Sequence, residues 1–220
     1  MQKNYAKIIA YWDYIFDEEE IGIPTNSKIG IDKLNNAMDW LCDDSKSIID
    51  FGCGNGSLCF FAAMRGVKHL LGLDLSEIAI NKALRSSMLL PEQEMRFERG
   101  GVYELQMVES QSFDGAILSN IIDNLYPDDA EKVLFEIARI LKPSGKVFLK
   151  VNSWLTPEEI KANGIKVLEG DMLDDGLLLL NKTTEEWKKI FNRDFVVENH
   201  EEVYYPKFDQ TNRIFYLHKK

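Results

Sequence analysis

The sequence predicts an α/β protein in which helices cover both faces of a parallel sheet. From residue 45 onwards, short apolar runs typical of strands alternate with longer segments of helical periodicity. Two of the strand candidates carry the apolar runs "HLLGL" (69–73) and "GAIL" (115–118), as strands buried on both faces do. Strands that alternate with helices are joined by right-handed crossovers, which predicts a three-layer, doubly wound fold.

The first 44 residues are predicted to form a helical cap ahead of this alternation. Residues 5–16 have a helical pattern that is rich in aromatic side chains. A second helix is predicted over 31–41, because apolar residues recur there at spacings of three and four. These residues are Ile31, Leu34, Met38 and Leu41.

Residues 45–152 are predicted to be the core, with five strands and three helices. The strands are placed at 47–51, 69–75, 95–99, 113–119 and 146–151. The helices are placed at 58–65, from Ser76 to about Leu89, and from Pro127 to about Leu141. Ser57 is expected to cap the first helix and Gly66 to end it, while Pro127 stands at a helix start.

Beyond residue 152 the alternation stops, although the whole chain of 220 residues is predicted to be one domain. A hairpin insertion is predicted within 153–182, where two apolar runs flank a turn rich in Gly and Asp. Residues 183–220 are predicted to close the domain, with Thr183 and Glu186 forming a capping box. The two final strands, joined by a connection too short for a crossover, are predicted to be antiparallel, at about 195–205 and 213–218.

The composition excludes several classes of partner. The formal net charge of -10 argues against nucleic acid or an anionic membrane surface. The three cysteines lack CxxC spacing, so we expect reduced thiols in a cytoplasmic protein, with no disulfide framework and no metal site. No apolar run approaches the ~18 residues of a membrane-spanning helix. The sequence does not indicate the oligomeric state.

A glycine-rich turn follows the first core strand. In "IIDFGCGNGS" (48–57), glycines alternate with other residues between a strand and a helix. Glycines at such a turn adopt backbone angles closed to other residues and let a ligand approach the main chain. Parallel sheets bind ligands at this edge, and Asp74, which ends the next strand, can accept hydrogen bonds from both hydroxyls of a ribose. Together these features predict an adenosine-containing ligand.

Two residues near the turn separate the possible ligands. A dinucleotide-binding Gly-x-Gly-x-x-Gly pattern would need glycine at position 57, where this chain has serine. Asp50, just before the first glycine, would repel a pyrophosphate but attract an ammonium group. No Gly-Lys-Ser/Thr follows the turn, so the pattern is not a Walker motif. These observations favour a sulfonium that carries an amino acid.

Four ordered segments carry a resemblance to a known family: "IIDFGCGNG", "GLDLS", "FDGAILSN" and "LKPSGKVFL". Across about residues 45–152 the chain resembles the class I S-adenosylmethionine-dependent methyltransferases, particularly the small-molecule type. The resemblance implies a Rossmann-like, mostly parallel sheet of seven strands with an antiparallel last strand. It also implies S-adenosylmethionine as cofactor, S-adenosylhomocysteine as product, a small molecule as acceptor, and direct displacement aided by alignment in a dry pocket.

The same resemblance implies which residues bind the cofactor. The turn would pass under the methionyl part, and its residues are Gly52, Cys53, Gly54, Asn55 and Gly56. Asp50 would face the amino group, Asp74 would bind the ribose hydroxyls, and Leu75 would lie on the adenine. Ser119 and Asn120 would place a backbone carbonyl near the ammonium.

Gly101 departs from the family pattern, because an acid often stands there to meet the adenine amino group. Backbone groups of Gly101 and Val102 are therefore expected to hold the adenine.

The acceptor side carries fewer signals. Asp123, Asn124 and His200 are candidate catalytic residues, with a capping, loop or structural role as the alternative for each. Four aromatic residues of the first helix are candidates for a lid, with packing on the sheet as the alternative: Tyr11, Trp12, Tyr14 and Phe16. Trp154 is a further lid candidate. The predicted hairpin stands where this family builds its acceptor pocket.

The sequence therefore predicts an S-adenosylmethionine-dependent methyltransferase whose acceptor it does not name. Two alternatives stay open. A nicotinamide-dependent oxidoreductase would share the fold, and a non-catalytic S-adenosylmethionine-binding protein would bind the cofactor without turnover.

Overall fold

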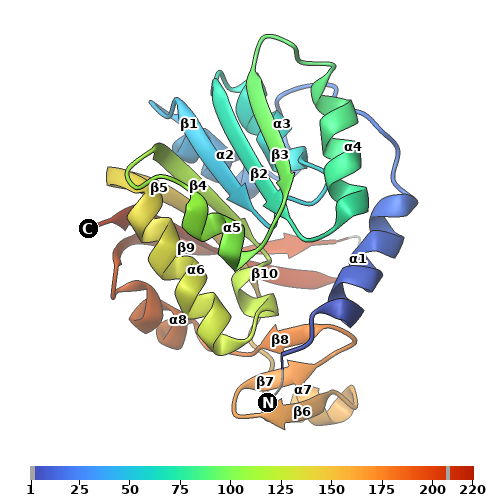
Figure 1. Ribbon diagram of the computed structural model, residues 1–220. Coiled ribbons are helices and arrows are strands. Elements are labelled where there is room, and N and C mark those ends of the chain that lie inside the picture. The colour runs from blue at the N-terminus through green and yellow to red at the C-terminus, as the bar shows by residue number, and fades with distance from the viewer. Residues whose placement is uncertain (1–2, 207–208) are drawn as a thin grey trace.

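In the residues that the structure describes, 3–206 and 209–220 of a computed structural model, a seven-stranded sheet forms the middle layer (Figure 1). Its order is β3-β2-β1-β4-β5-β10-β9. The strands are β1 Ser47–Phe51, β2 His69–Asp74, β3 Glu94–Arg99, β4 Phe113–Ser119, β5 Leu141–Asn152, β9 Phe195–Tyr205 and β10 Gln210–Lys219. The first five are parallel, whereas β10 is antiparallel to both β5 and β9. The predicted α/β fold with antiparallel closing strands is confirmed.

Helices cover both faces of the sheet, each burying an apolar stripe. One face carries α2 Asp32–Cys42, α3 Ser57–Met64 and α4 Glu77–Ser87. The other carries α5 Val102–Met107, α6 Pro127–Ile140 and α8 Thr184–Phe191 (Figure 1). The stripe predicted for the second helix is buried as expected at Leu34, Met38 and Leu41. Burial of these stripes is the main force that holds the helices on the sheet.

The strand order reverses direction between β1 and β4, because β2 and β3 lie on one side of β1 while β4 and β5 lie on the other. Chain segments that leave β1 and β4 at their carboxyl ends therefore diverge to opposite faces of the sheet. The divergence leaves a crevice at the edge, which is where open α/β sheets bind ligands. The glycine turn after Phe51 and the segment after Ser119 both lie at this edge.

Additional elements surround the same edge. Helix α1 Ala6–Asp17 belongs to the N-terminal region, and helix α7 Pro157–Ala162 follows β5. The predicted insertion is a small antiparallel sheet with one more strand than the expected hairpin: β6 Lys166–Glu169, β7 Met172–Asp174 and β8 Leu178–Leu180. Helices α5 and α7 and the 3-10 turn η1 Ile122–Asn124 were not predicted, since each is too short to show a helical period.

One predicted cap is wrong. Gly56, with a φ of 82°, is the N-cap of α3, and Ser57 is the first helical residue. The Ser57 hydroxyl instead donates a hydrogen bond to Asn55 Oδ1 at 2.6 Å. No helix within the described ranges is long and apolar enough to cross a bilayer.

Gly56 and Gly66 provide a matched test of how closely α3 packs on the sheet. Both have positive φ, 82° and 94°, but a Cβ at Gly56 would lie 2.8 Å from Phe97 Cε1, whereas nothing lies within 4 Å of one at Gly66. Gly66→Ala should therefore lower the free energy of unfolding by about 1 kcal/mol through backbone strain alone. Gly56→Ala should lower it by about 2–4 kcal/mol, because overpacking adds to that strain. Urea unfolding followed by circular dichroism measures both values, and equal losses would contradict the close packing.

Candidate functional site

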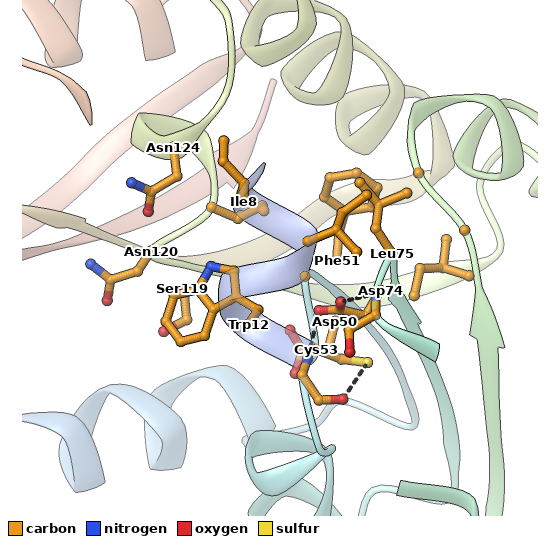
Figure 2. A pocket seen from close by; sticks show the side chains of 18 of the residues that line it. Ile8, Trp12, Asp50, Phe51, Cys53, Asp74, Leu75, Ser119, Asn120 and Asn124 are labelled. Carbon is orange, nitrogen blue, oxygen red and sulfur yellow. Dashed lines mark hydrogen bonds between the residues drawn. The ribbon is translucent and has the colours of Figure 1, made fainter. Parts of the chain in front are cut away.

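A cavity of about 520 Å³ lies at the carboxyl edge of β1, β2 and β4 (Figure 2). Its walls come from the glycine turn, the ends of β2 and β4, the segment after β3, and α1. All of the residues predicted to bind a cofactor line it, except Gly56. The lining residues of this set are Asp50, Gly52, Cys53, Gly54, Asn55, Asp74, Leu75, Gly101, Val102, Ser119 and Asn120. Gly56 lies beneath the turn, against Phe97.

The glycine turn is fixed to β2 and brought close to α1. The backbone N–H groups of Gly52 and Cys53 donate to the Leu73 carbonyl oxygen at 2.8 and 3.1 Å. Gly54 has a φ of 54°, and a Cβ there would lie 2.7 Å from Phe16 Cζ. A side chain at this position would therefore require the Phe16 ring to shift, and the positive φ also favours glycine here.

Asp74 anchors the turn through two hydrogen bonds. Its Oδ2 accepts from the Gly54 N–H and its Oδ1 from the Ser76 N–H, both at 2.8 Å. Burial raises the pKa of Asp74, and these backbone donors act against that rise. Because a carboxylate offers about four acceptor sites, each oxygen keeps capacity for a further donor from the cavity.

Asp50 is the more deeply buried carboxylate, with 2% of its surface exposed. The Cys59 thiol donates to its Oδ2 at 3.7 Å, but no partner for Oδ1 exists among the described residues. Burial raises the pKa of Asp50 to about 8, and the negative charge of Asp74 contributes. A buried acceptor without a donor is costly, so this oxygen is suited to a ligand that brings a donor or a cation.

The end of β4 forms the wall opposite the turn. Asn120 has a φ of 54°, and its backbone N–H donates to the Lys150 carbonyl oxygen at 2.7 Å. Its side-chain amide contacts two other amides, Asn152 and Asn212, at 3.2 Å each. This network fixes the direction in which the chain leaves β4, with Ser119 and Asn120 both facing the cavity.

Residues after β3 form the end of the cavity near Leu75. The Gly101 N–H donates to Glu104 Oε2 at 2.7 Å, and the Gly101 carbonyl accepts from the Leu105 N–H. Both Gly101 backbone groups are therefore engaged within α5. The Val102 N–H, in the first turn of α5, has no acceptor within the helix and so remains for a ligand.

Helix α1 forms the roof of the cavity with one of its faces. Trp12 and Phe16, one turn apart, stack with ring centroids 5.7 Å apart, and both line the cavity. Tyr11 and Tyr14, which are 45% and 67% exposed, do not line it. Of the four lid candidates in this helix, the structure places Trp12 and Phe16 at the cavity and leaves Tyr11 and Tyr14 outside it.

Comparisons with known proteins assign this geometry to a family. Residues 42–194, well over half of the chain, match the family model described as "Methyltransferase domain". The chain belongs to the class I S-adenosylmethionine-dependent methyltransferases.

Individual relatives of the methyltransferase are distant. The tRNA N(3)-methylcytidine methyltransferase trm140 of Schizosaccharomyces pombe is 24% identical over 204 residues, 86% of this chain and 65% of that protein. A ubiquinone biosynthesis O-methyltransferase of Neisseria meningitidis is 28% identical over 145 residues, 66% of this chain and 57% of that protein. The match thus spans less than two thirds of either relative.

Among solved structures, the same fold occurs in the Burkholderia thailandensis 1,6-didemethyltoxoflavin-N1-methyltransferase. That structure aligns with a TM-score of 0.67 at 19% identity, over 84% of this chain and 77% of that chain.

A second cavity of about 960 Å³ adjoins the first. Trp12, Asn120 and Asn124, which Figure 2 labels at the first cavity, line both. The second cavity reaches the predicted insertion, since Leu177, Leu178 and Leu179 form part of its wall. Asn124 is held there by a hydrogen bond from its Nδ2 to the Leu178 carbonyl oxygen at 2.7 Å.

The other acceptor-side candidates lie away from both cavities. Asp123 is 1% exposed, and its Oδ2 accepts from the backbone and side-chain N–H groups of Asn152 at 2.7 and 2.8 Å. His200 is exposed on β9, where its ring stacks on Phe215 with centroids 5.9 Å apart. Trp154 is 42% exposed and lines neither cavity. In the described ranges no cluster of His, Cys, Asp and Glu could hold a metal.

Sequence reasoning missed Lys150, Asn152, Tyr205 and Asn212, which line the second cavity. The available signal was the pair of polar residues, Lys150 and Asn152, in the mostly apolar segment "VFLKVN" (147–152) of β5. That signal did not indicate which way the side chain points.

The raised pKa of Asp50 predicts a pH-dependent stability. Its pKa of about 8 in the folded protein exceeds the ~3.9 of an unfolded aspartate, so the folded state holds the extra proton between these values. The free energy of unfolding should therefore fall as the pH rises from 5 to 8, by up to about 1.4 kcal/mol per unit from this group. Asp50→Asn, which mimics the protonated form, should remove this contribution and be the more stable protein at pH 8.

Urea unfolding of the ligand-free protein at several pH values measures the effect. Glu92→Gln, at an exposed turn, is the matched control and should keep the wild-type dependence. If the free energy of unfolding changed with pH in the same way in wild type and in Asp50→Asn, Asp50 would be ionised in the folded protein.

Proposed function

We propose that this domain binds S-adenosylmethionine in the smaller cavity and transfers its methyl group to a small molecule held in the larger one. The observation that carries the proposal is the buried Asp50 Oδ1, for which the described residues provide no donor, at the wall of a cavity closed by glycine backbone. An ammonium group is the ligand chemistry that such an oxygen favours. Asp74, with unused acceptor capacity beside it, suits the hydroxyls of a ribose.

The remaining contacts follow from the cavity wall. The turn from Gly52 to Gly54 would lie under the methionyl chain, and the backbone after Ser119 would meet its ammonium from the other side. At the opposite end, Leu75 would contact the adenine while the Val102 N–H donates to it. Gly101 permits this approach, because a Cβ there would lie 3.1 Å from Leu75 Cδ2.

The bound sulfonium supplies a methyl group on a good neutral leaving group. The residues of this chain align the partners and exclude water. Trp12 and Phe16 cover the cavity, and α1 is held down by the Ser76 hydroxyl donating to Asp13 and by Lys82 donating to the Asp17 carbonyl. We infer that cofactor entry requires α1 to move.

A small-molecule acceptor is favoured over a nucleic acid. The net charge of -10 opposes a polyanion, and acidic side chains from three separate segments line the larger cavity: Glu159, Asp175 and Asp209. One relative is named for ubiquinone biosynthesis and another for tRNA. The tRNA relative makes a nucleic acid the alternative acceptor, and the three buried free cysteines support a cytoplasmic setting.

Calorimetric titration with S-adenosylhomocysteine tests the cofactor site. Wild type should bind with micromolar affinity and should not bind NADH. Asp74→Ala should weaken binding by at least about 30-fold, because charge-assisted hydrogen bonds contribute about 1.5–3 kcal/mol each. Asp74→Asn, which keeps one acceptor oxygen, should lose less. Thermal unfolding of each variant checks that the turn still folds. NADH binding in place of the homocysteine ligand would move the protein to the oxidoreductases.

The proton balance of the same titration tests Asp50 directly. A carboxyl with a pKa of about 8 is mostly protonated at pH 7, and pairing with an ammonium ionises it. Binding at pH 7 should therefore release close to one proton, and the release should approach zero by pH 9. Titrations in buffers of different ionisation enthalpy measure this. 5′-Methylthioadenosine, which lacks the amino acid, is the control and should release no proton from Asp50; equal release by both ligands would contradict the assignment.

A further inference from the structure

Lys150 lies in the wall of the larger cavity, near the end of β5 and between the buried apolar residues Leu149 and Val151. The strand pairs Lys150 with Ser119 of β4 and with Ile214 of β10, at the sheet edge where the two cavities adjoin. Its Nζ donates to the Tyr205 hydroxyl oxygen at 3.2 Å and lies 5.3 Å from the centroid of the Tyr205 ring. The amine is thus held at a cavity wall by one aromatic side chain.

We propose that Lys150 is the general base of the methyl transfer and that the acceptor is a small molecule with an acidic, phenol- or enol-type hydroxyl. This inference rests on the proposed function, because it needs the larger cavity to hold the acceptor. Lys150 is the one basic side chain among the described residues that line that cavity. The other neighbours of the reacting group would be amides, from Asn120, Asn152 and Asn212.

The charge environment suits a lysine that loses and regains its proton near neutral pH. Burial lowers the pKa of Lys150 to about 8, and the negative charge of Asp123 in η1 acts against that change. Tyr205, from β9, is itself a weaker acid than usual, because burial raises its pKa to about 12. It therefore stays a neutral partner for the amine throughout this range.

Other charged groups reach the neighbourhood from further elements. Arg213 of β10 donates to the Asn152 carbonyl oxygen at 2.7 Å and is a second cation close to Asp123. Three carboxylates line the same cavity from α7, from the β7–β8 turn and from the residue just before β10: Glu159, Asp175 and Asp209. Glu159 accepts from the Thr156 N–H and Asp209 from the Tyr204 hydroxyl, and both keep their negative charge and further acceptor capacity.

The position of the amine discriminates between acceptor types. An amine acceptor would arrive as an ammonium beside Lys150, and two cations at one buried position repel each other. An acidic hydroxyl has no such penalty, because its oxygen gains negative charge beside a group that is becoming a cation. The Tyr205 ring and Asp123 stabilise that cation once it forms.

The step balances in atoms and electrons. The hydroxyl proton moves to the lone pair of Lys150 Nζ as the acceptor oxygen forms a bond to the methyl carbon, and the electrons of the broken sulfur–methyl bond stay on sulfur. The Lys150 ammonium then returns its proton to solvent. The pKa of Lys150, about 8, lies near a working pH around neutrality, which is where a general base is most effective.

The first test measures the amine itself, without turnover. Brief acetylation with acetic anhydride from pH 6 to 10, followed by peptide mass spectrometry, gives the titration of Lys150 relative to a model lysine peptide in the same tube. We expect half-maximal reactivity near pH 8, against ~10.4 for the peptide. If Lys150 and the model peptide reached half-maximal reactivity at the same pH, the proposal would be overturned.

The second test uses 4-nitrocatechol as the acidic phenol, whose ionised form is coloured, in the presence of saturating S-adenosylhomocysteine. Wild type should bind it and raise its ionised fraction at pH 6, whereas Lys150→Met should lose at least about 10-fold in affinity and all of the colour change. Lys146→Met is the matched control, since Lys146 lies on the same strand and 5.5 Å from an aromatic ring, that of Trp40, outside the cavity. Lys146→Met should bind 4-nitrocatechol and raise its ionised fraction as wild type does.

The third test uses labelled S-adenosylmethionine with a panel of phenols and the anilines and alkylamines of matching shape. Phenols should be methylated with a pH profile that rises to a plateau with a midpoint near 8, and Lys150→Met should lower that rate at least about 100-fold. Methylation of the amines alone, no binding of any phenol, or an unchanged profile in Lys150→Met would each overturn the proposal. Normal S-adenosylhomocysteine affinity in Lys150→Met separates this outcome from failure of the cofactor site.

Discussion

The candidate site depends on two carboxylates that lie side by side near the ends of parallel strands, at the wall of one cavity. Asp50 is the next-to-last residue of β1 and Asp74 ends the neighbouring β2, and the negative charge of Asp74 raises the cost of ionising Asp50. Backbone donors from Gly54 and Ser76 relieve Asp74, while Asp50 has only the weak thiol donor of Cys59 among the described residues. The two acids therefore differ in role. Asp74 anchors the glycine turn and keeps acceptor capacity, whereas Asp50 has an oxygen that is suited to a cation.

The glycine turn is the structural consequence of that arrangement. Donors can reach Asp74 only if the chain after β1 folds back over β2, and the positive φ values at Gly52 and Gly54 produce that path. The same path brings the turn against Phe16 of α1, so the N-terminal helix closes the cavity that the turn opens. The backbone conformation of Gly52, Cys53 and Gly54 therefore determines both the hydrogen bonding to Asp74 and the position of α1 over the cavity.

Sequence reasoning could predict this half of the molecule because its signals are local. The alternation of strands and helices, the glycines after β1 and the acid after β2 each follow from spacing, and the structure places these residues together. The lid was less predictable, since a helix rich in aromatics does not show which face turns inward; Trp12 and Phe16 do, whereas Tyr11 and Tyr14 do not. The acceptor side was the least predictable. Asp123 proved to be a buried support for Asn152, and the cavity is lined by residues from β5, β9 and β10 that only tertiary structure brings together.

Burial shifts pKa values in opposite directions in the two cavities, which meet at Trp12, and the proposed chemistry depends on this difference. It raises the pKa of an acid, Asp50, and lowers that of a base, Lys150, so that each changes charge near pH 8. In the ligand-free protein below pH 8 the acid is thus largely uncharged and the amine is largely an ammonium, whereas above pH 8 the acid is ionised and the amine is neutral. A cofactor that carries an ammonium would favour the ionised acid. The neutral fraction of Lys150, which grows as the pH rises through 8, would take the acceptor proton. Two cavities that share Trp12, Asn120 and Asn124 among the described residues therefore place the buried acid at one end of the site and the buried base at the other.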